Sequence, residues 1–294
     1  MQDFTGKTAF ITGAASGIGL GMARAFGHEG MNVVVADIDH EAAKEAVRTL
    51  ADQQIKAKAV HIDVGDRGSV REAALETIAA YGKVHVVCNN AGVATGGPLG
   101  QIADGDWEWI IDVNLKGVVY GVETFAPLIQ SHGEGGHIVN TASIAGLVSG
   151  AGSEPYSATK YAVVAMSEGW AQQLAPTGVG LSVLCPGYVR TRIASSARNR
   201  QDRYGEHADD GFAGAGTAVA HAVDEGLDPG VVGKRVVEAV RNGDLYIFTD
   251  PRFREIVEYR FAAIRAGFDA AAASPALKAV KDWAPLMRGP QTEA

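Results

Sequence analysis

The chain has 294 residues, of which 47% are hydrophobic and 20% charged, so it can bury a full core and is neither disordered nor fibrous. Its 26 Lys and Arg residues against 34 Asp and Glu give a net charge of -8 at pH 7, the wrong sign for binding nucleic acid through phosphates. The two cysteines are too few for a disulfide framework, and no apolar run approaches the ~18 residues of a membrane span. Since no signal-peptide pattern follows Met1, we expect a soluble cytoplasmic protein with no membrane or nucleic-acid partner.

Apolar runs rich in β-branched residues alternate with amphipathic stretches along the chain. The runs are Thr8–Thr12, Asn32–Asp37, Ala57–Asp63, Val84–Asn89, Gly136–Asn140, Gly180–Cys185 and Leu245–Thr249. Between the first two, Ile18, Met22 and Phe26 recur at helical spacing, and Asp39 is a suitable N-cap for the next helix. This alternation predicts the α/β class, with a doubly wound parallel sheet of about seven strands and helices on both faces.

The alternation stops between Arg192 and about Pro229. A stretch of this length without periodicity indicates a functional loop or a lid. Its charged and aromatic cluster consists of Arg192, Arg198, Arg200, Arg203 and Tyr204. We interpret these arginines as a solvated face rather than an anion site.

A helical stripe of apolar residues follows the last predicted strand. Its members are Phe253, Ile256, Val257, Phe261, Ile264 and Phe268. Because this stripe is too apolar to lie in water, we expect it to cover the body of its own subunit, a subunit interface or the mouth of the substrate site.

A glycine-rich turn comes directly after the first predicted strand, with the sequence Thr12-Gly13-Ala14-Ala15-Ser16-Gly17-Ile18-Gly19. Glycine lets backbone N–H groups approach a pyrophosphate closely, and the N-terminus of the following helix contributes partial positive charge. The position between the first strand and the first helix is the one that a dinucleotide site requires. The sequence therefore predicts a dinucleotide cofactor.

Asp37 ends the second predicted strand, about twenty residues past the glycines, where a carboxylate can bind an adenosine ribose and repel a 2′-phosphate. No Lys or Arg follows Asp37 directly, and Ser16 rather than a basic residue precedes Gly17. NAD is therefore favoured over NADP. Asp63-Val64 and Asn90-Ala91-Gly92 close the third and fourth strands at the same edge of the sheet.

Ser143, Tyr156 and Lys160 form a second group in the middle of the chain. With Pro155 in the first turn of a helix, Tyr156 and Lys160 lie at i and i+4 and share one face. An unperturbed phenol has a pKa of ~10, and a nearby ammonium favours the phenolate, so the pair is suited to general acid–base chemistry.

The order and spacing of these motifs resemble the short-chain dehydrogenase/reductase family, in its single-domain branch. The matching features are T-G-x-x-x-G-x-G at Thr12–Gly19, Asn89-Asn90-Ala91-Gly92, Asn114 within Asp112–Gly117, Ser143, Tyr156, Lys160, Pro186-Gly187, Val189 and Thr191. They cover residues 5–249. The resemblance implies a Rossmann-fold catalytic domain over residues 1–249, with a substrate-binding loop at 192–230. Residues 250–294 would be a C-terminal helical extension, serving as a lid or an interface.

The resemblance also implies roles for single residues. Tyr156 would exchange a proton with the substrate oxygen, and Ser143 would hold that oxygen by a hydrogen bond. Lys160 would bind the nicotinamide ribose and lower the pKa of Tyr156, while Asn114 would anchor a water that relays protons. The implied cofactor site consists of Gly13, Ser16, Gly17, Ile18, Gly19, Asp37, Asp63, Val64, Asn90, Ala91, Gly92, Tyr156, Lys160, Pro186, Gly187, Val189 and Thr191.

Members of this family usually pair two helices with their copies across a twofold axis, so we expect a homodimer or homotetramer. The helices would be those that carry Asn114 and Tyr156. Their apolar residues are Leu115, Val118, Val119, Val122, Phe125, Tyr161, Val164 and Trp170. The eight histidines show no paired-ligand spacing, so we expect no metal site.

The expected function is an NAD-dependent oxidoreductase acting on a secondary alcohol or ketone. Residues 246–251 and the following aromatic helix are similar to those of relatives that act on bulky apolar or aromatic alcohols, among them the Cα-dehydrogenases of lignin-derived aryl ethers. The alternatives are a carbonyl reductase working mainly towards the alcohol and a catalytically silent dinucleotide-binding protein. A sugar-nucleotide epimerase or dehydratase would have a differently spaced glycine motif and a larger substrate domain.

Overall fold

The computed structural model describes residues 1–205, 217–280 and 283 of the chain. The chain forms two compact units, Met1–Pro251 and Arg252–Ala294. Each unit is described by itself.

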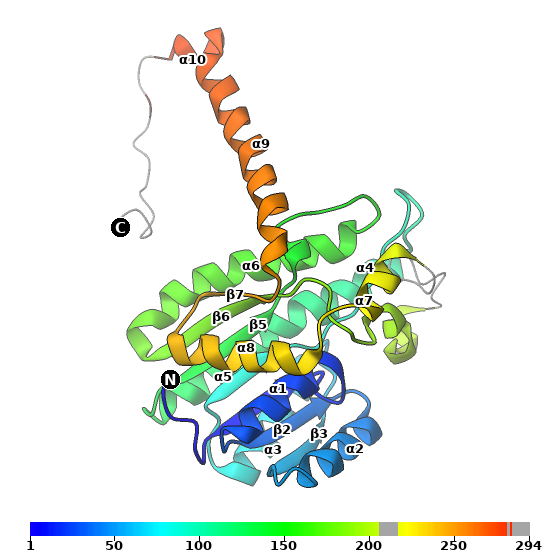
Figure 1. The fold of residues 1–294 in the computed structure, drawn as a ribbon, viewed down its shortest axis with the longest axis vertical. Coiled ribbons are helices and arrows are strands. Elements are labelled where there is room, and N and C mark those ends of the chain that lie inside the picture. Colours follow the sequence, from blue (N-terminus) through cyan, green and yellow to red (C-terminus); the bar gives the residue numbers. More distant parts are fainter. Residues whose placement is uncertain (206–216, 281–282, 284–294) are drawn as a thin grey trace. The chain divides into compact units, whose positions relative to one another are not determined.

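The first unit is built on one parallel sheet of seven strands in the order β3-β2-β1-β4-β5-β6-β7 (Figure 1). The strands are β1 Thr8–Thr12, β2 Asn32–Asp37, β3 Ala57–His61, β4 Val86–Asn89, β5 Gly136–Thr141, β6 Val179–Cys185 and β7 Tyr246–Phe248. This order confirms the predicted doubly wound sheet, and every strand end lies within two residues of its prediction. Because all strands are parallel, their carboxyl ends meet at one edge, where such sheets bind ligands.

Helices cover both faces of this sheet. The covering helices are α1 Gly17–His28, α2 His40–Ala51, α3 Arg67–Tyr81, α5 Gly117–Ser131, α6 Glu154–Leu174 and α8 Pro229–Asn242; α4 Asp104–Ile111 and α7 Ala218–Asp224 belong to the same unit. As predicted, Asp39 caps α2 by accepting a hydrogen bond from the backbone N–H of Ala42. Helices α1 and α8 can approach closely because Gly21 and Gly233 lack side chains. A Cβ on either residue would collide with backbone atoms of the opposite helix.

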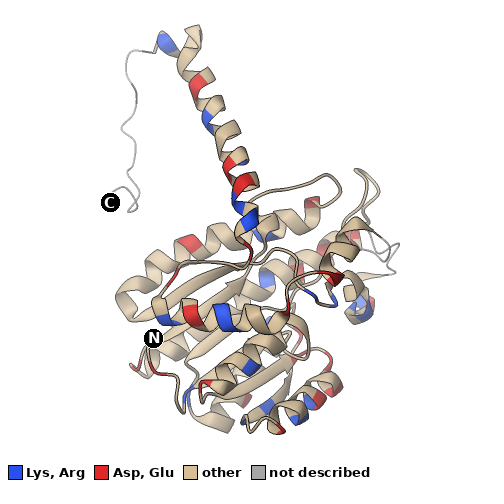
Figure 2. Cartoon of the chain, viewed as in Figure 1, with Lys and Arg blue, Asp and Glu red and all other residues tan. Residues whose placement is uncertain are grey.

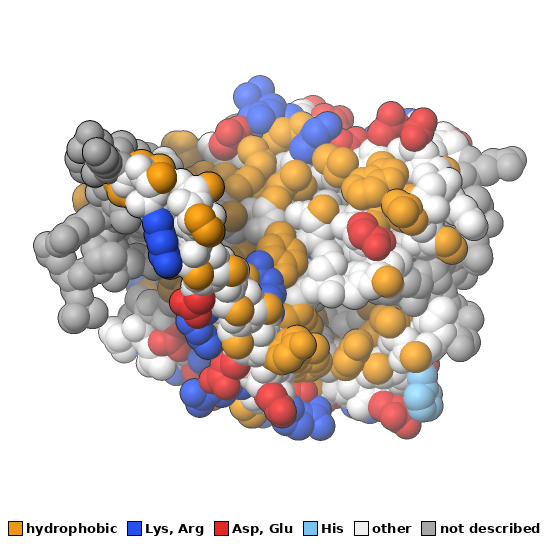
Figure 3. Space-filling view, turned by 90° about the horizontal axis from the view of Figure 1, so that it is seen from above, with side chains coloured by type: hydrophobic (Ala, Val, Ile, Leu, Met, Phe, Trp, Pro, Cys, Tyr) orange, Lys and Arg blue, Asp and Glu red, His pale blue; other side chains and the backbone are white. Residues whose placement is uncertain are grey.

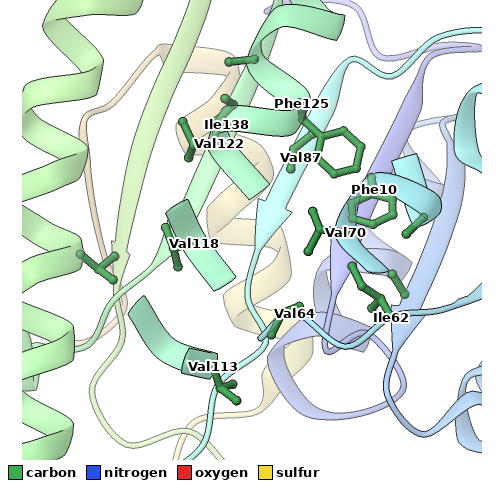
Figure 4. Packing of buried hydrophobic residues seen from close by; sticks show 14 of the residues in the cluster. Phe10, Ile62, Val64, Val70, Val87, Val113, Val118, Val122, Phe125 and Ile138 are labelled. Atoms are coloured by element: carbon green, nitrogen blue, oxygen red, sulfur yellow. The ribbon is translucent and has the colours of Figure 1, made fainter. Parts of the chain in front are cut away.

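The core has two parts, one on each side of the sheet, because alternate residues of a strand face opposite sides. Phe10 of β1 packs with Val87 and Phe125 in the cluster under α3, α5 and α6 (Figure 4). Its neighbour Ile11 belongs to the other cluster, under α1, α2 and α8. Burial on both faces explains why the strands read as continuous apolar runs rather than alternating ones.

The segment 192–230, predicted to be structureless, contains short helices in its described part. These are η4 Ile193–Asn199, η5 Asp202–Tyr204 and the whole of α7. The prediction was wrong here because helices of three to seven residues are too short to show a hydrophobic period. Residues 206–216 of the predicted loop lie outside the described part.

The second unit consists, in its described part, of helices α9 Arg254–Ala273 and α10 Pro275–Lys278. No residue of α9 is buried, and Ile256, Phe261 and Phe268 of the predicted stripe are exposed. Figure 3 shows such hydrophobic side chains lying open among charged ones on the face that it presents. Basic and acidic residues are interspersed along α9 and along α2 (Figure 2). Among the described helices, none has the length and apolar character needed to cross a bilayer.

Candidate active site

The glycine turn after β1 forms a cradle that side chains would fill. Gly13 and Gly17 have φ angles of 63° and 54°, which L-residues rarely adopt, and a Cβ on Gly19 would collide with the carbonyl oxygen of Gly13. Ser16 is the N-cap of α1, with Ile18 in the first turn, yet its side chain caps no backbone N–H. The first-turn donors of α1 therefore remain available to an anion, as a pyrophosphate site requires.

Thr12 joins this cradle to the loop after β4. Its hydroxyl oxygen accepts hydrogen bonds from the backbone N–H of Asn90, at 2.8 Å, and of Ala91, at 2.9 Å. The Asn90 side chain in turn donates to the Thr12 carbonyl at 2.9 Å. The structure thus brings Gly13, Asn90 and Ala91 together, although they are distant in sequence.

Asp37 is a buried carboxylate, 8% exposed, at the end of β2. Its oxygens accept from the backbone N–H of Ala15 at 3.0 Å and of Asp39 at 3.1 Å. Burial raises the pKa of Asp37, and these two N–H donors oppose the rise. Arg198 of η4 also lies within electrostatic reach and lowers the pKa of Asp37, a basic neighbour that sequence reasoning missed.

Asp63 lies beyond the end of β3, and an arginine of the segment 192–230 pairs with it. Arg203 Nη1 is 2.8 Å from Asp63 Oδ2, while Oδ1 accepts from the backbone N–H of Gly65 at 2.9 Å. Val64 beside it packs against Gly117, the first residue of α5. Arg203 is exposed, with 45% of its side chain accessible, as expected of a solvated face, and it also pairs with a carboxylate from another loop.

Arg200, in contrast, departs from the expectation of a solvated face. Its Nη1 is 2.7 Å from Asp106 Oδ1 of α4, and the two side chains are only 6% and 7% exposed. The guanidinium also lies over the ring of Trp109, 5.2 Å from its centroid. Trp109 is fully buried. This pair is a buried anchor of the loop rather than a surface feature.

Ser143, Tyr156 and Lys160 come together beyond the end of β5. Helix α6 begins at Glu154 with Pro155 in its first turn, as predicted, so Tyr156 and Lys160 project from one face. A hydrogen bond joins Ser143 to the Tyr156 hydroxyl. The Lys160 Nζ lies 5.6 Å from the centroid of the Tyr156 ring and donates to the Thr141 carbonyl at 3.0 Å.

Burial dominates the titration of this trio. It raises the pKa of Tyr156, which the hydrogen bond from Ser143 partly offsets, and lowers the pKa of Lys160 to about 8. The lowered tyrosine pKa that the resemblance implied is therefore not found in the chain by itself. Both charged forms lose hydration in the same buried site, and this loss outweighs the attraction between ammonium and phenolate.

Asn114 lies in a π-helical turn, η1 Asp112–Lys116, between α4 and α5. Its side chain is fully buried and spans the loop after β4, accepting from Val93 N–H at 2.8 Å and donating to the Val93 carbonyl at 2.9 Å. A Cβ on Gly92 would lie 3.4 Å from Asn114 Oδ1 and 3.6 Å from Lys160 Nζ. The structure thus places Gly92 between the side chains of Asn114 and Lys160.

The segment after β6 closes the site beside the glycine turn. The Pro186 carbonyl accepts from Ile144 N–H at 2.8 Å, and Gly187 N–H donates to the Thr249 hydroxyl at 3.2 Å. Val189 pairs with Leu227, and the Thr191 methyl carbon would lie 3.0 Å from a Cβ on Gly17. Thr191 also lines a pocket of about 500 Å³ together with residues of η4 and α7.

Three groups that sequence spacing did not bring together, His85, His132 and Glu134, lie near one another at the opposite edge of the sheet. His85 Nδ1 accepts from Thr8 N–H, so its Nε2 carries the proton toward Glu134. His132 Nδ1 accepts from Glu134 N–H, and its Nε2 donates to the Val84 carbonyl. Neither ring keeps a free lone pair, so this group does not fit a metal.

Comparison with known proteins identifies the family of the chain. Residues 7–202 match the family described as short chain dehydrogenase. The C alpha-dehydrogenase of Sphingobium sp. (strain NBRC 103272 / SYK-6) is 38% identical over 268 residues, which are 90% of this chain and 87% of that protein. The 3beta-hydroxysteroid dehydrogenase 2 of Eggerthella lenta is 36% identical over 211 residues, 71% of this chain and 81% of that protein.

A solved structure shows the same likeness in three dimensions. The crystal structure of a short chain dehydrogenase/reductase from Burkholderia phymatum in complex with NAD has a TM-score of 0.87 at 37% sequence identity. It covers 91% of this chain and 97% of its own. A family match over most of the sequence, with relatives of this identity and coverage, shows that the chain belongs to the short chain dehydrogenase family of oxidoreductases.

Proposed function

We propose that the protein is an NAD-dependent dehydrogenase that interconverts a bulky secondary alcohol and its ketone. The observation that carries this proposal is the meeting of the hydrogen-bonded Ser143 and Tyr156 with Lys160 and Gly92 at one edge of the sheet. A silent dinucleotide-binding protein has no need of a buried lysine beside a partly buried tyrosine, since both cost desolvation free energy.

NAD, when bound, supplies the acceptor for the hydride of the carbinol carbon. Tyr156 exchanges the proton of the alcohol oxygen, and Ser143, already bonded to the Tyr156 hydroxyl, orients that oxygen. Lys160 contributes a positive charge close to the phenol ring, which favours the phenolate as the proton moves. The side chain of Asn114 is already hydrogen-bonded to Val93. The relay water would therefore be held by the backbone carbonyl of Asn114, which lies in a π-helical turn with i→i+5 hydrogen bonds.

Two features favour NAD over NADP. The Asp37 carboxylate is fixed beside the cradle by two backbone N–H groups, where it would repel a 2′-phosphate. The relative from Burkholderia phymatum was crystallised with NAD. The residues proposed to hold the pyrophosphate are those of the glycine cradle, Gly13–Gly19.

The relatives support the substrate class. One relative is named a C alpha-dehydrogenase and another for a hydroxysteroid, which is a bulky apolar alcohol. We therefore favour an aromatic or alicyclic secondary alcohol, a lignin-type aryl ether alcohol among them, with a carbonyl reductase using the same site in reverse as the alternative.

The test is a screen of the purified protein with NAD against aryl and alicyclic secondary alcohols, following the absorbance of NADH. With an alcohol that the screen shows to be oxidised, Tyr156→Phe should lower kcat by about 100-fold or more. It should leave the Kd for NAD nearly unchanged, because the hydroxyl of Tyr156 acts on the substrate. Tyr161→Phe on the same helix is the matched control. A Tyr156→Phe variant that keeps a tenth of kcat would remove Tyr156 from proton transfer.

A further inference from the structure

A short stretch of the substrate loop, Arg200–Gly205, is clamped onto the helix that leads to Asn114; we name it the hook. Arg200 pairs with the buried Asp106 of α4 and also donates to the carbonyls of Tyr204, at 2.6 Å, and Gly205, at 3.1 Å. A Cβ on Gly105 of α4 would collide with the Tyr204 carbonyl, so the two backbones are in direct contact. The hook is therefore fixed both to itself and to α4.

Tyr204 connects the hook to the π-helical turn η1 by a hydrogen bond. It is 5% exposed, and its hydroxyl donates to Asp112 Oδ2 at 3.0 Å while accepting from Arg203 Nη2 at 2.8 Å. Burial raises the pKa of Tyr204 to about 12, so the hydroxyl keeps its proton and remains a donor at neutral pH. Asp112 is the first residue of η1, two positions before Asn114.

A second contact joins the substrate loop to the loop after β4 that the Asn114 side chain binds. The buried Ser196 of η4 accepts from Ala94 N–H at 3.0 Å and donates to the Ala94 carbonyl at 3.3 Å. Ala94 follows Val93, whose N–H and carbonyl both bond the Asn114 side chain. The substrate loop thus contacts both the π-helical turn that carries Asn114 and the loop after β4 to which the Asn114 side chain is hydrogen-bonded.

We propose that Tyr204 and Ser196 are positioning residues that couple the substrate loop to Asn114. Neither reaches the glycine cradle, so each acts through Asn114 and the turn that bears it. The same segment that would recognise the alcohol would then set the geometry of the proton relay, so that a poorly seated loop slows proton transfer as well as weakening binding. The activity arm of this inference rests on the proposed function, whereas the structural coupling does not.

The coupling is tested by amide hydrogen exchange on the full chain, comparing Tyr204→Phe with the wild type. We expect exchange in peptides over residues 110–117 to rise about threefold to tenfold, the effect of losing one buried hydrogen bond, with peptides over α1 and α2 unchanged. Lys116→Met is the matched control, because Lys116 is the other partner of Asp112, at 2.7 Å from Oδ1, and is half exposed. Unchanged exchange over 110–117 in Tyr204→Phe, or an equal rise in Lys116→Met, would overturn the proposal.

Ser196→Ala provides a second, independent variant. It should raise amide exchange in peptides over residues 92–96 and 110–117. The variant removes the hydrogen bonds from Ser196 to Ala94, next to the residue that the Asn114 side chain binds. Ser195→Ala is its control. Among the described contacts, the exposed Ser195 hydroxyl bonds only Arg192 and Arg198, which lie in or beside η4. A Ser196→Ala variant that behaves like Ser195→Ala would remove Ser196 from the coupling.

The activity arm uses 1-phenylethanol with NAD, or the best alcohol from the screen. Tyr204→Phe should lower kcat about threefold to tenfold and leave the KM for NAD unchanged, and Asp112→Ala combined with Tyr204→Phe should cost no more than Asp112→Ala alone. Additive losses, or an unchanged kcat with a lowered melting temperature, would reduce Tyr204 to a packing residue. A wild type that oxidises no alcohol would defeat the proposed function, while the exchange result would still decide the coupling.

Discussion

At the scale of single residues, burial is the main influence on the proposed catalytic groups. Lys160 is almost fully buried and its pKa is lowered to about 8, whereas a lysine in the unfolded chain titrates near ~10.4. Below pH 8 the folded chain therefore carries a charge that burial disfavours. Between the two pKa values the unfolded chain binds more protons, so the free energy of unfolding rises with pH across this range.

We therefore expect Lys160→Met to stabilise the chain without cofactor while impairing both NAD binding and turnover. The gain should be about 1 to 3 kcal/mol at pH 7 and should fade as the pH rises towards 10, because the wild-type amine then loses its charge. Urea unfolding at the two pH values measures it, with the exposed Lys44→Met as control. A variant less stable than the wild type at pH 7 would show that the lost hydrogen bond to Thr141 outweighs burial of the charge.

Cofactor choice also depends on single residues. Asp37→Ala should weaken NAD binding and relieve the repulsion of a 2′-phosphate, shifting the preference by about 1 to 3 kcal/mol. The sequence alone predicts that such a variant is indifferent to the phosphate, because no Lys or Arg follows Asp37 directly. Arg198 revises this expectation: its charge reaches Asp37 from the loop, so the variant should gain affinity for NADP.

The Kd values for NADH and NADPH measure this shift. Adding Arg198→Met to Asp37→Ala should remove most of the gain in NADPH affinity. Asp37→Asn keeps an acceptor for Ala15 or Asp39 and separates the lost charge from a loosened glycine turn. A wild type that already prefers NADPH would contradict the role given to Asp37.

At the scale of elements, the anchor between the substrate loop and α4 is the Arg200–Asp106 pair. Removing one partner of a buried pair leaves the other charge without compensation, which typically costs about 3 to 5 kcal/mol. We expect Arg200→Met to lower the free energy of unfolding by an amount in this range, measured by urea denaturation. The Arg190–Asp228 pair has a similar distance but is 59% and 58% exposed, so Arg190→Met should cost less than about 1 kcal/mol. Equal effects of the two substitutions would show that burial does not strengthen the anchor.

At the scale of the whole molecule, the expected subunit interface is smaller than the sequence indicated. Val118, Val122, Phe125 and Val164 are buried in the core of the single chain and are not available to a partner. Leu115, Val119, Tyr161 and Trp170 are only partly buried, so they remain candidates for pairing with a second copy. A dimer or tetramer in light scattering at micromolar concentration is the expected result, and a sharp monomer mass would contradict it.

The C-terminal unit supplies the other prediction at this scale. All residues of the glycine cradle precede it, so truncation after Asp250 should leave the Kd for NAD unchanged. The sequence predicts one of two roles for this extension, a lid or an interface; if it is a lid, the KM should rise much more for a bulky alcohol than for a small one. Steady-state kinetics on the truncated and full chains, with light scattering of both, measure this. An equal change for both substrates, or loss of the oligomer without a change in selectivity, would make the extension a structural element.

The sequence by itself determined the parallel sheet, because continuous β-branched apolar runs that alternate with helical stretches are a local pattern; β1 and β2 begin and end at the predicted residues. It also placed Tyr156 and Lys160 on one helical face, since their spacing is set within one turn. Only the tertiary structure decided which carboxylates the loop arginines meet, because Arg200 and Asp106 are 94 residues apart and Tyr204 and Asp112 are 92. It decided the pKa directions of Tyr156 and Lys160 as well, because desolvation depends on every element packed around a group rather than on its neighbours in sequence.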